Sequence, residues 1–393
     1  MQSYQHITPA LRLYTGPDSL GQLGRELARL NSQRALVVCG PWAEGPLLDA
    51  VLGAAGERCA GVFTGVLAHS PIDSVEAAAA EVKRLGVDSL IALGGGSSIV
   101  TARAASILAA ESAAQPGAGV RQLCTTTGPD GRLNSPRLQA PKHPQIIIPT
   151  TPTTAMVKAG SAVFDPATAE RLPLYDPKTR ASSVFVHPDF IASAPVGLVV
   201  SASLNTFSLA IEGLVSRQGD PIADALLMHV LRLTAQHLAN PDLASDADAR
   251  ADLVVAAVMC GQGTDHTAAG ITTVLGHAIG ARHGAENGVL NGIVLAHALR
   301  FNGTANEVGL RKVAAALDLG SAGSGEALVQ AIVQRVSSLF AAIGVPQRLR
   351  DVGVPQDGLA VVADAALGDW FLRGNPRRVH NATELLSVLQ NAW

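Results

Sequence analysis

Residues 88–111 read DSLIALGGGSSIVTARAASILAAE, an apolar run, three glycines and a long alanine-rich segment in direct succession. This order predicts a buried strand, a tight turn and a helix. Glycines let a backbone approach a ligand closely, and free N–H groups at a helix start attract phosphate. The stretch therefore predicts an anion site at Gly94, Gly95, Gly96 and Ser97, with a ligand-free strand–helix turn as the alternative. The spacing is not GxGxxG, so the ordinary dinucleotide-binding fingerprint is absent.

Similar signals flank this stretch on both sides. RALVVCG (34–40) and QIIIPTT (145–151) are short apolar runs of the kind found in buried parallel strands, and 71–86 has the spacing of a helix. The segment 161–175 predicts a hairpin. Strands that alternate with helices imply a mostly parallel sheet covered by helices on both faces. Thr150 and Thr151 end one strand with hydroxyls suited to phosphate or ribose, although turn satisfaction explains them equally well.

Strand signals disappear after about Pro195. Helical spacing then recurs to the end of the chain, in segments near 197–217, 221–239, 249–263, 267–281, 288–301, 306–317, 325–343 and 357–367. We therefore expect an α/β domain over 1–189 and an all-α domain over 190–393. In enzymes that bind nucleotides, the active site usually lies in a cleft between two such domains.

Composition limits the function classes. The chain has 393 residues, of which 48% are hydrophobic and 16% charged, and its net charge is −3. This balance gives no reason to expect nucleic acid or a membrane as a partner. No signal peptide or run of membrane-spanning length is visible. The four scattered cysteines predict buried thiols in a reducing compartment, so we expect a cytoplasmic protein that acts on a small molecule.

The segment VLGHAIGARHGAENG (274–288) first suggests a metal site, because it holds His277, His283 and Glu286. The two histidines are six residues apart, however, about 240° around a helix, so they do not share a face. A shell completed by Glu286 or by Asp265 and His266 is the remaining route to a metal. A structural histidine is the alternative reading of His277. His229, His237 and His297 are interpreted as structural or surface histidines.

Several motifs together resemble the iron-containing alcohol dehydrogenases, whose fold is like that of dehydroquinate synthase. They are LGGGSSIVTARA, IPTTPTTA, AIEGLVS with DPIADAL, GHAIG, LAHALRFN and NPRRV, in the family's order from about residue 10 to the C-terminus. The resemblance implies an NAD(P)-binding N-terminal domain, a helical C-terminal domain and hydride transfer in the cleft. It also implies an NAD(P)-dependent oxidoreductase, and we expect a homodimer.

The family's metal ligands are missing. Most members hold a divalent metal with an Asp, a His one helical turn later and two further His. The corresponding positions carry Asn205, Leu209, Thr273 and Asn287. Leucine cannot ligate and asparagine ligates weakly. We therefore expect no metal in this protein.

Other departures bear on substrate and branch. The family's GGGSxxDxAK motif has Val100 and Arg103 at its Asp and Lys positions. Loss of that Asp, and Asn205 in place of the metal-binding Asp, resemble the maleylacetate reductase branch, whose members do not depend on iron. That branch's PTTYAGSE-like segment is absent, which leaves the substrate open.

The resemblance places His277 near the nicotinamide rather than on the metal. Imidazole titrates near neutral pH and suits general acid work, so His277 is the expected proton donor. The acidic residue that usually bonds the adenosine ribose falls on Gly40, which removes one barrier to NADP and gives a mild preference for it over NAD.

The expected function is a metal-independent NAD(P)H-dependent reductase of a carbonyl compound. Substrate candidates are Lys158, Arg282 and His283, although ordinary solvated charge also explains the first two. The alternative is a nucleotide-binding homologue that keeps the fold but not the dehydrogenase chemistry, either as a catalytically silent partner protein or with a different activity.

Overall fold

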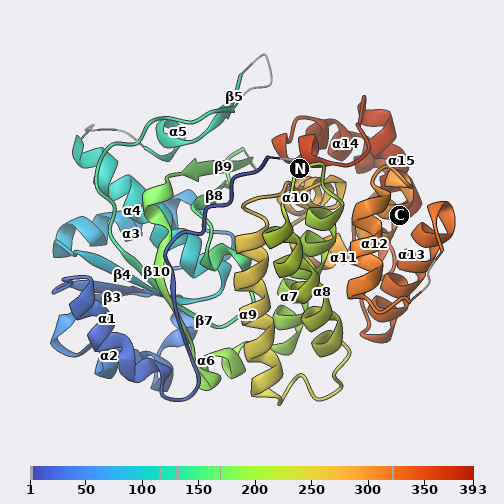
Figure 1. Cartoon of the computed structure of the whole chain (residues 1–393). Helices are drawn as coiled ribbons and strands as arrows, with labels where there is room; N and C mark the ends of the chain where they lie inside the picture. Colours follow the sequence, from blue (N-terminus) through green and yellow to red (C-terminus); the bar gives the residue numbers. More distant parts are fainter. Residues whose placement is uncertain (1–2, 115–116, 118, 129–132, 169, 321–322) are drawn as a thin grey trace. The chain divides into compact units, whose positions relative to one another are not determined.

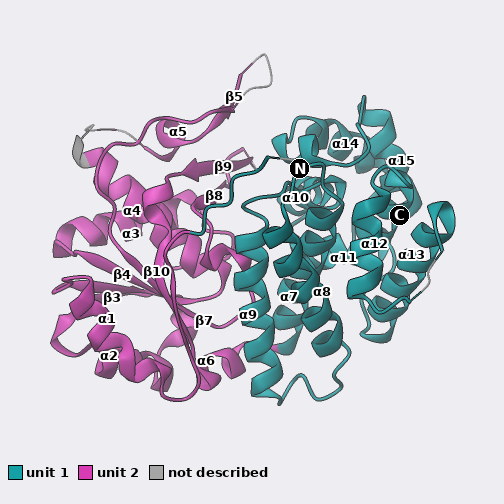
Figure 2. Cartoon of the chain, in the orientation of Figure 1, with its two compact units in different colours: residues 1–8, 196–393 teal, residues 9–195 magenta. Residues whose placement is uncertain are grey.

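The chain divides into two compact units (Figure 2). The computed structural model describes residues 1–393 except 1–2, 115–116, 118, 129–132, 169 and 321–322. One unit comprises residues 9–195, and the other comprises residues 1–8 and 196–393. The division falls after Pro195 rather than after residue 189, because helix α6 (Pro188–Ser193) packs with the sheet. Residues 1–8 belong with the helical unit, which the sequence analysis does not anticipate.

The unit of residues 9–195 is built on a six-stranded parallel sheet with the order β1-β10-β7-β4-β2-β3 (Figure 1). Its strands are β1 (Arg12–Thr15), β2 (Ala35–Val38), β3 (Cys59–Phe63), β4 (Ser89–Gly94), β7 (Gln145–Pro149) and β10 (Ala181–Val186). Its main helices are α1 (Leu23–Arg29), α2 (Pro46–Ala55), α3 (Ile72–Leu85) and α4 (Gly96–Ala114). The expected parallel sheet is confirmed.

Both faces of the sheet are buried. In β2 and β4, Val37 and Ile91 join the core formed with α1 and α2, whereas Leu36 and Leu90 point to the opposite face. Helices α3 and α4 pack against that second face. A strand covered on both sides must be apolar at every position, which explains its continuous hydrophobic run.

The strand order reverses between β2 and β4. From β2 the chain passes to β3 on one side and then crosses to β4 on the other side of β2. In open α/β sheets, ligands bind outside the carboxyl ends of the strands at such a switch point. The switch point of this sheet lies at the ends of β2 and β4, where the chain continues into Gly40 and Gly95.

Smaller elements lie outside the six-stranded sheet. The expected hairpin is present as β8 (Gly160–Asp165) paired antiparallel with β9 (Glu170–Tyr175). The polar segment between α4 and β7 also contains a short helix, α5 (Val120–Leu123), and a two-stranded ribbon of β5 (Thr126–Thr127) and β6 (Leu133–Asn134).

The second unit is helical, as the sequence predicts. Its helices are α7 (Val196–Val215), α8 (Pro221–Leu238), α9 (Ala247–Gly263), α10 (Ile271–His283), α11 (Asn287–Asn302), α12 (Glu307–Ala316), α13 (Gly325–Ala342), α14 (Leu359–Leu367) and α15 (Ala382–Ala392). Only α15 lies outside the segments expected to be helical. By length and composition α7 would pass as a membrane span, but 72% of its most apolar window is buried inside the protein, as in a core helix.

Close packing between α7 and α11 depends on a glycine. A Cβ atom on Gly288 would lie 1.7 Å from the carbonyl oxygen of Ser201, a separation that no side chain tolerates. The backbones of the two helices therefore approach each other directly at this point. This contact brings Asn205 of α7 within hydrogen-bond distance of Asn291 of α11, since their amide groups are 2.9 Å apart.

Candidate functional site

The glycine turn between β4 and α4 is crowded at Gly94 and Gly95. Gly94 has φ +135°, and a Cβ there would lie 2.5 Å from the Ser98 hydroxyl. A Cβ on Gly95 would lie 2.9 Å from the Thr151 hydroxyl. Helix α4 begins at Gly96, so its first N–H groups lie at this half-exposed turn. The residues present fit the pyrophosphate of a dinucleotide, because a helix N-terminus binds anions through those groups.

The neighbouring strand end supports the same turn. Thr150 and Thr151 are buried directly after β7, and the N–H of Thr150 donates to the carbonyl of Gly94 at 3.2 Å. Ser97 is held from the opposite side, because its hydroxyl accepts the N–H of His69 at 3.1 Å. The structure thus brings together Gly94–Ser97 and the two threonines, as the sequence predicts.

Trp42 is a residue of this region that the sequence analysis misses. Its ring lies 2.7 Å from where a Cβ of Gly40 would be and 2.9 Å from where a Cβ of Gly94 would be. The indole therefore packs on both glycines, across the switch point of the sheet, while 49% of the residue remains exposed. An exposed tryptophan directly after a strand-ending Gly-Pro was the available signal.

His277 lies in the middle of α10 and is 35% exposed in its side chain. Its Nδ1 is 3.5 Å from Oδ2 of Asp369, and its ring is tilted against Phe371 at 5.8 Å between centroids. Asp369 is fixed in turn, because its other oxygen accepts the N–H of Phe371 at 2.9 Å. A carboxylate that holds one imidazole nitrogen leaves Nε2 available to a substrate. Sequence spacing gave no signal for Asp369.

The four positions that would hold the family's metal carry a poor set of donors. Leu209 packs against the helical core, and Asn205 shares its amide contact with Asn291. The hydroxyl of Thr273 donates to Oε2 of Glu212 at 2.6 Å, so it is already engaged. Asn287 offers only a neutral amide. Iron and zinc in proteins are held by carboxylate, imidazole or thiolate ligands, so these four residues do not fit such an ion.

Glu212 lies beside Thr273 and is buried at the start of α10. Besides Thr273, it accepts the N–H of Thr272 at 2.7 Å. Burial raises the pKa of Glu212, while the hydrogen bonds from Thr273, Gly270 and Thr272 oppose that effect. A carboxylate at a helix N-terminus satisfies free N–H groups and interacts favourably with the helix dipole.

We expect Glu212→Ala to lower the free energy of unfolding by about 2–4 kcal/mol, because three buried donors lose their acceptor. Urea denaturation measures the change, and Glu286→Ala at the exposed start of α11 is the control.

The pKa of Glu212 in the native state lies above the ordinary value of 4.5. The native state therefore binds the carboxyl proton of Glu212 more tightly than the unfolded state does. The contribution of this group to the free energy of unfolding falls as the pH rises above about 4.5. Wild-type stability that changes with pH no more than that of Glu212→Gln would contradict this assignment.

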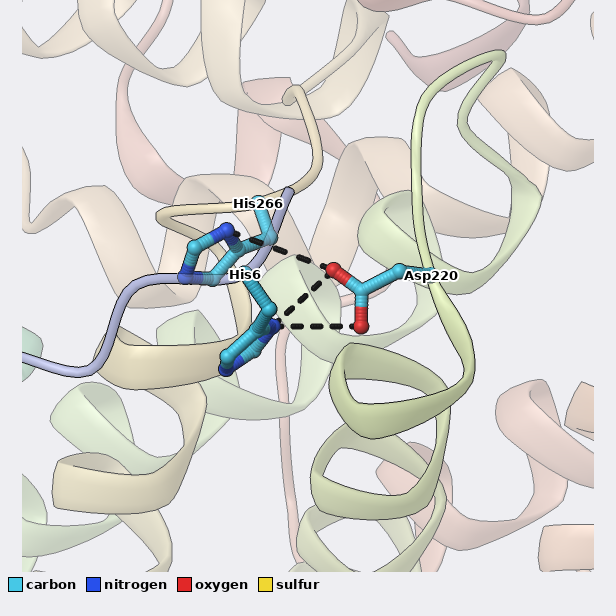
Figure 3. Close-up of side chains that lie close together, drawn as sticks. All are labelled: His6, Asp220 and His266. Carbon is cyan, nitrogen blue, oxygen red and sulfur yellow. Dashed lines mark hydrogen bonds and ion pairs between the residues drawn. The ribbon is translucent and has the colours of Figure 1, made fainter. Parts of the chain in front are cut away.

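A separate cluster joins the N-terminal segment to the helical unit (Figure 3). Nδ1 of His6 lies 3.0 and 3.1 Å from the two carboxylate oxygens of Asp220, and Nδ1 of His266 is 4.0 Å from one of them. The two rings are stacked, 3.7 Å apart at an interplanar angle of 22°. Ring nitrogens ligate a metal in the plane of the ring, so two nearly parallel rings at this separation cannot share one ion.

Asp220 is also committed to the fold. It caps α8 by accepting the N–H groups of Ile222 and Ala223, and Nε2 of His266 donates to the carbonyl of Ile7 at 3.1 Å. Burial alone would raise the pKa of Asp220, but the His6 and backbone hydrogen bonds outweigh it and lower that pKa. The cluster therefore fastens residues 6–7 to the helical unit rather than forming a metal shell from His266.

The three substrate candidates lie in different places. Lys158 belongs to the sheet-containing unit, before β8, whereas Arg282 and His283 end α10 in the helical unit. His283 faces Gly358, where a Cβ would be 3.8 Å from its Nε2, and so points to other neighbours than His277 does. Burial, followed by the charge of Arg282, lowers the pKa of His283.

Arg103, at the position of the family's Lys, has a structural role. It is 1% exposed, and its guanidinium donates to the carbonyls of Gly160 at 2.8 Å and Ala155 at 2.6 Å. Burial lowers the pKa of Arg103 to about 9, with a smaller contribution from the charge of Arg180. Arg103 thus fixes the segment that follows the two threonines.

Two family models together match most of the chain. The model described as iron-containing alcohol dehydrogenase matches residues 9–188, and the model of the C-terminal region of the same family matches residues 199–393. Among curated proteins, lactaldehyde reductase of Escherichia coli strain K12 is 28% identical over 387 residues, covering 96% of this chain and 97% of that protein. Maleylacetate reductase of Burkholderia cepacia is 26% identical over 370 residues, covering 93% and 91%.

Solved structures share the fold. The crystal structure of a 1,3-propanediol oxidoreductase has a TM-score of 0.89 at 22% identity and covers 100% of both chains. Maleylacetate reductase from Rhizobium sp. strain MTP-10005 has a TM-score of 0.80 at 23% identity, covering 100% of this chain and 99% of that one. The chain is thus similar in sequence to oxidoreductases of the alcohol dehydrogenase type. The family matches identify the chain as a member of the iron-containing alcohol dehydrogenase family.

Proposed function

We propose that this oxidoreductase is a metal-independent, NAD(P)H-dependent reductase of a small carbonyl compound, with His277 as the proton donor. The observation that carries the proposal is the contrast within α10. His277 keeps a carboxylate partner in Asp369, whereas Thr273, one turn earlier, is bonded to Glu212 and offers nothing to a metal. The donor for the substrate oxygen is then a protein side chain rather than a Lewis acid.

The glycine turn supports the choice of cofactor. Gly94–Ser97 and the start of α4 would hold the pyrophosphate, and Thr150 and Thr151 would lie near the phosphates or the nicotinamide ribose. At the end of β2, Gly40 presents no carboxylate that would repel a 2′-phosphate, so NADP and NAD both remain acceptable. Reduced nicotinamide supplies the hydride when it is bound.

The remaining chemistry belongs to this chain. As the carbonyl carbon accepts the hydride, negative charge develops on its oxygen, and Nε2 of His277 gives that oxygen a proton to complete the alcohol. Asp369 orients the ring through its contact with Nδ1. Because His277 is 35% exposed in its side chain, solvent can return the proton after each turnover. Lys158, Arg282 and His283 remain candidates for contacts to a polar or acidic substrate.

The proposal includes a cytoplasmic location and, as a separate expectation, a homodimer. The location is supported by the cysteines, since Cys39, Cys59, Cys124 and Cys260 are all free. Burial raises the pKa of Cys39 to about 11, which keeps that thiol protonated and unreactive. Four free thiols suit a reducing compartment.

The test is a reductase assay on metal-depleted protein. We expect an excess of chelator to leave the rate within about twofold, because no step passes through a metal, and ferrous ion or zinc to add nothing. The substrates to try first are lactaldehyde, maleylacetate and sulfoacetaldehyde, on which relatives with those names act. Elemental analysis should find far less than one iron or zinc per chain.

Two outcomes contradict the proposal. About one metal per chain, with activity lost on chelation and restored by the ion, would show that other residues supply the ligands. Tight binding of NADPH or NADH without turnover of any carbonyl compound would favour the catalytically silent partner, which the loss of the ligand side chains also suggests.

A further inference from the structure

Helix α11 contacts α13 and α15 in the helical unit. Two adjoining hollows lie beside these helices. Their volumes are about 470 and 200 Å³. His297 and Arg300 of α11, and Arg348 before α14, line both of them. Among the described residues that line either hollow, none is acidic.

The positive charges around these hollows are not neutralised locally. In the part of the chain that the structure describes, the guanidinium of Arg300 has no hydrogen-bond or ion-pair partner. Arg348 gives one N–H to the carbonyl of Asn391 at 2.8 Å, which leaves the rest of its guanidinium available. Asp351 lies nearby, but its carboxylate accepts the backbone N–H of Arg348 rather than pairing with the guanidinium.

The positive charges of Arg300 and Arg348 also affect the pKa of His297. Burial, and then the charges of Arg300 and Arg348, lower its pKa to about 4. A further arginine at the edge, Arg377, is already occupied, because it stacks on Phe301 at 4.1 Å and pairs with Glu384 at 3.4 Å. In a chain of net charge −3, the walls of this hollow carry two arginines with free donors and no carboxylate.

We infer that these hollows form a binding site for a small phosphate monoester, held by Arg300 and Arg348. Arginine forks match phosphate oxygens, and a concave surface lined by one sign of charge concentrates the opposite ion. In the same wall, the side-chain amide of Asn391 gives one N–H to the carbonyl of Ser387 at 2.8 Å, which leaves its second N–H for a phosphate oxygen. The hydroxyl of Ser387 already donates to the carbonyl of Glu384 at 2.7 Å. A cavity of about 470 Å³ is larger than a phosphate group and has the size of a small-molecule pocket, so an organic part can lie along Phe301.

This site is separate from the glycine turn, since all of its residues lie in the helical unit. The inference therefore does not depend on the proposed reductase activity. A phosphate monoester bound here is distinguished from the phosphates of a nicotinamide cofactor by the variant Gly95→Asp, which alters only the turn.

The probes are glycerol 3-phosphate, inorganic phosphate and glycerol, titrated calorimetrically into the full chain at low ionic strength. We expect glycerol 3-phosphate to bind with a Kd below about 1 mM, tighter than inorganic phosphate, and glycerol not to bind. Arg300→Gln and Arg348→Gln should each weaken binding at least tenfold. Arg232→Gln, an exposed arginine on α8, is the control and should bind as the wild type does, as should Gly95→Asp.

A second measurement does not depend on whether a variant folds well. In the wild-type protein, glycerol 3-phosphate should raise the pKa of His297 well above 4, followed by NMR of the imidazole signals, because a bound dianion stabilises the charged ring. Glycerol 3-phosphate that binds no better than inorganic phosphate, equal binding by the Arg300, Arg348 and Arg232 variants, or an unchanged His297 titration would each overturn the inference.

Discussion

His277→Ala is expected to lower turnover by about 10²–10⁴, the usual contribution of a positioned general acid and roughly 2.7–5.4 kcal/mol of barrier. The reason is that, under the proposed mechanism, removal of the imidazole leaves the developing alkoxide to take its proton from solvent, which is not positioned to donate it. Steady-state kinetics at saturating NADPH measure the effect. The affinity for cofactor should be unchanged, because the glycine turn belongs to the other unit.

Two further variants separate proton donation from structure. His283→Ala should change turnover much less, since its ring faces Gly358. Asp369→Asn should have an intermediate effect on turnover, because it weakens the contact of 3.5 Å with Nδ1 that orients the ring. Wild-type turnover by His277→Ala would return this histidine to an ordinary structural role, whatever the other two variants do.

Gly95→Asp is expected to weaken the binding of both NADH and NADPH by about 100-fold or more, roughly 2.7 kcal/mol. The new carboxylate would take the place of the pyrophosphate at the start of α4 and repel it. Its Cβ would also lie 2.9 Å from the Thr151 hydroxyl, which must rotate away. Nicotinamide fluorescence titration measures the affinity.

Gly95→Ala is the matched control, because it adds the same Cβ without the charge. We expect it to weaken binding less than tenfold. Equal losses in the two variants would assign the effect to crowding of Thr151, and unchanged affinity in Gly95→Asp would place the cofactor elsewhere. Trp42 packs on Gly94, so quenching of its emission by bound cofactor provides an independent signal from the same turn.

The departures from the family's ligand set have a physical consequence for catalysis. A bound metal would polarise the carbonyl whatever the state of nearby side chains, whereas a histidine donor makes the rate depend on pH. Thr273 stands at one of the family's ligand positions, and its hydroxyl and N–H group donate to the buried Glu212. These hydrogen bonds stabilise the start of α10.

Much of the fold follows from the sequence because its elements are long and strongly patterned. The α/β half, the helical half and eight helical segments between 197 and 367 were predictable from apolar periodicity. The strands β1, β3 and β10 were not identified. Strand β1 is largely exposed and β3 is only half-buried, so neither shows the clear apolar run of β4. Pairing with neighbours along the sheet decides their conformation.

The glycine turn, the two threonines and His277 were found from sequence because each depends on local chemistry, a backbone without side chains or an imidazole at a family position. Their partners depend on distant segments. Asp369 reaches His277 across 92 positions, Glu212 reaches Thr273 across 61, and His6 reaches Asp220 across 214. Sequence alone thus determined which groups could do chemistry. Tertiary packing decided which of them meet, because such contacts form only when helices far apart in the chain bury their faces together.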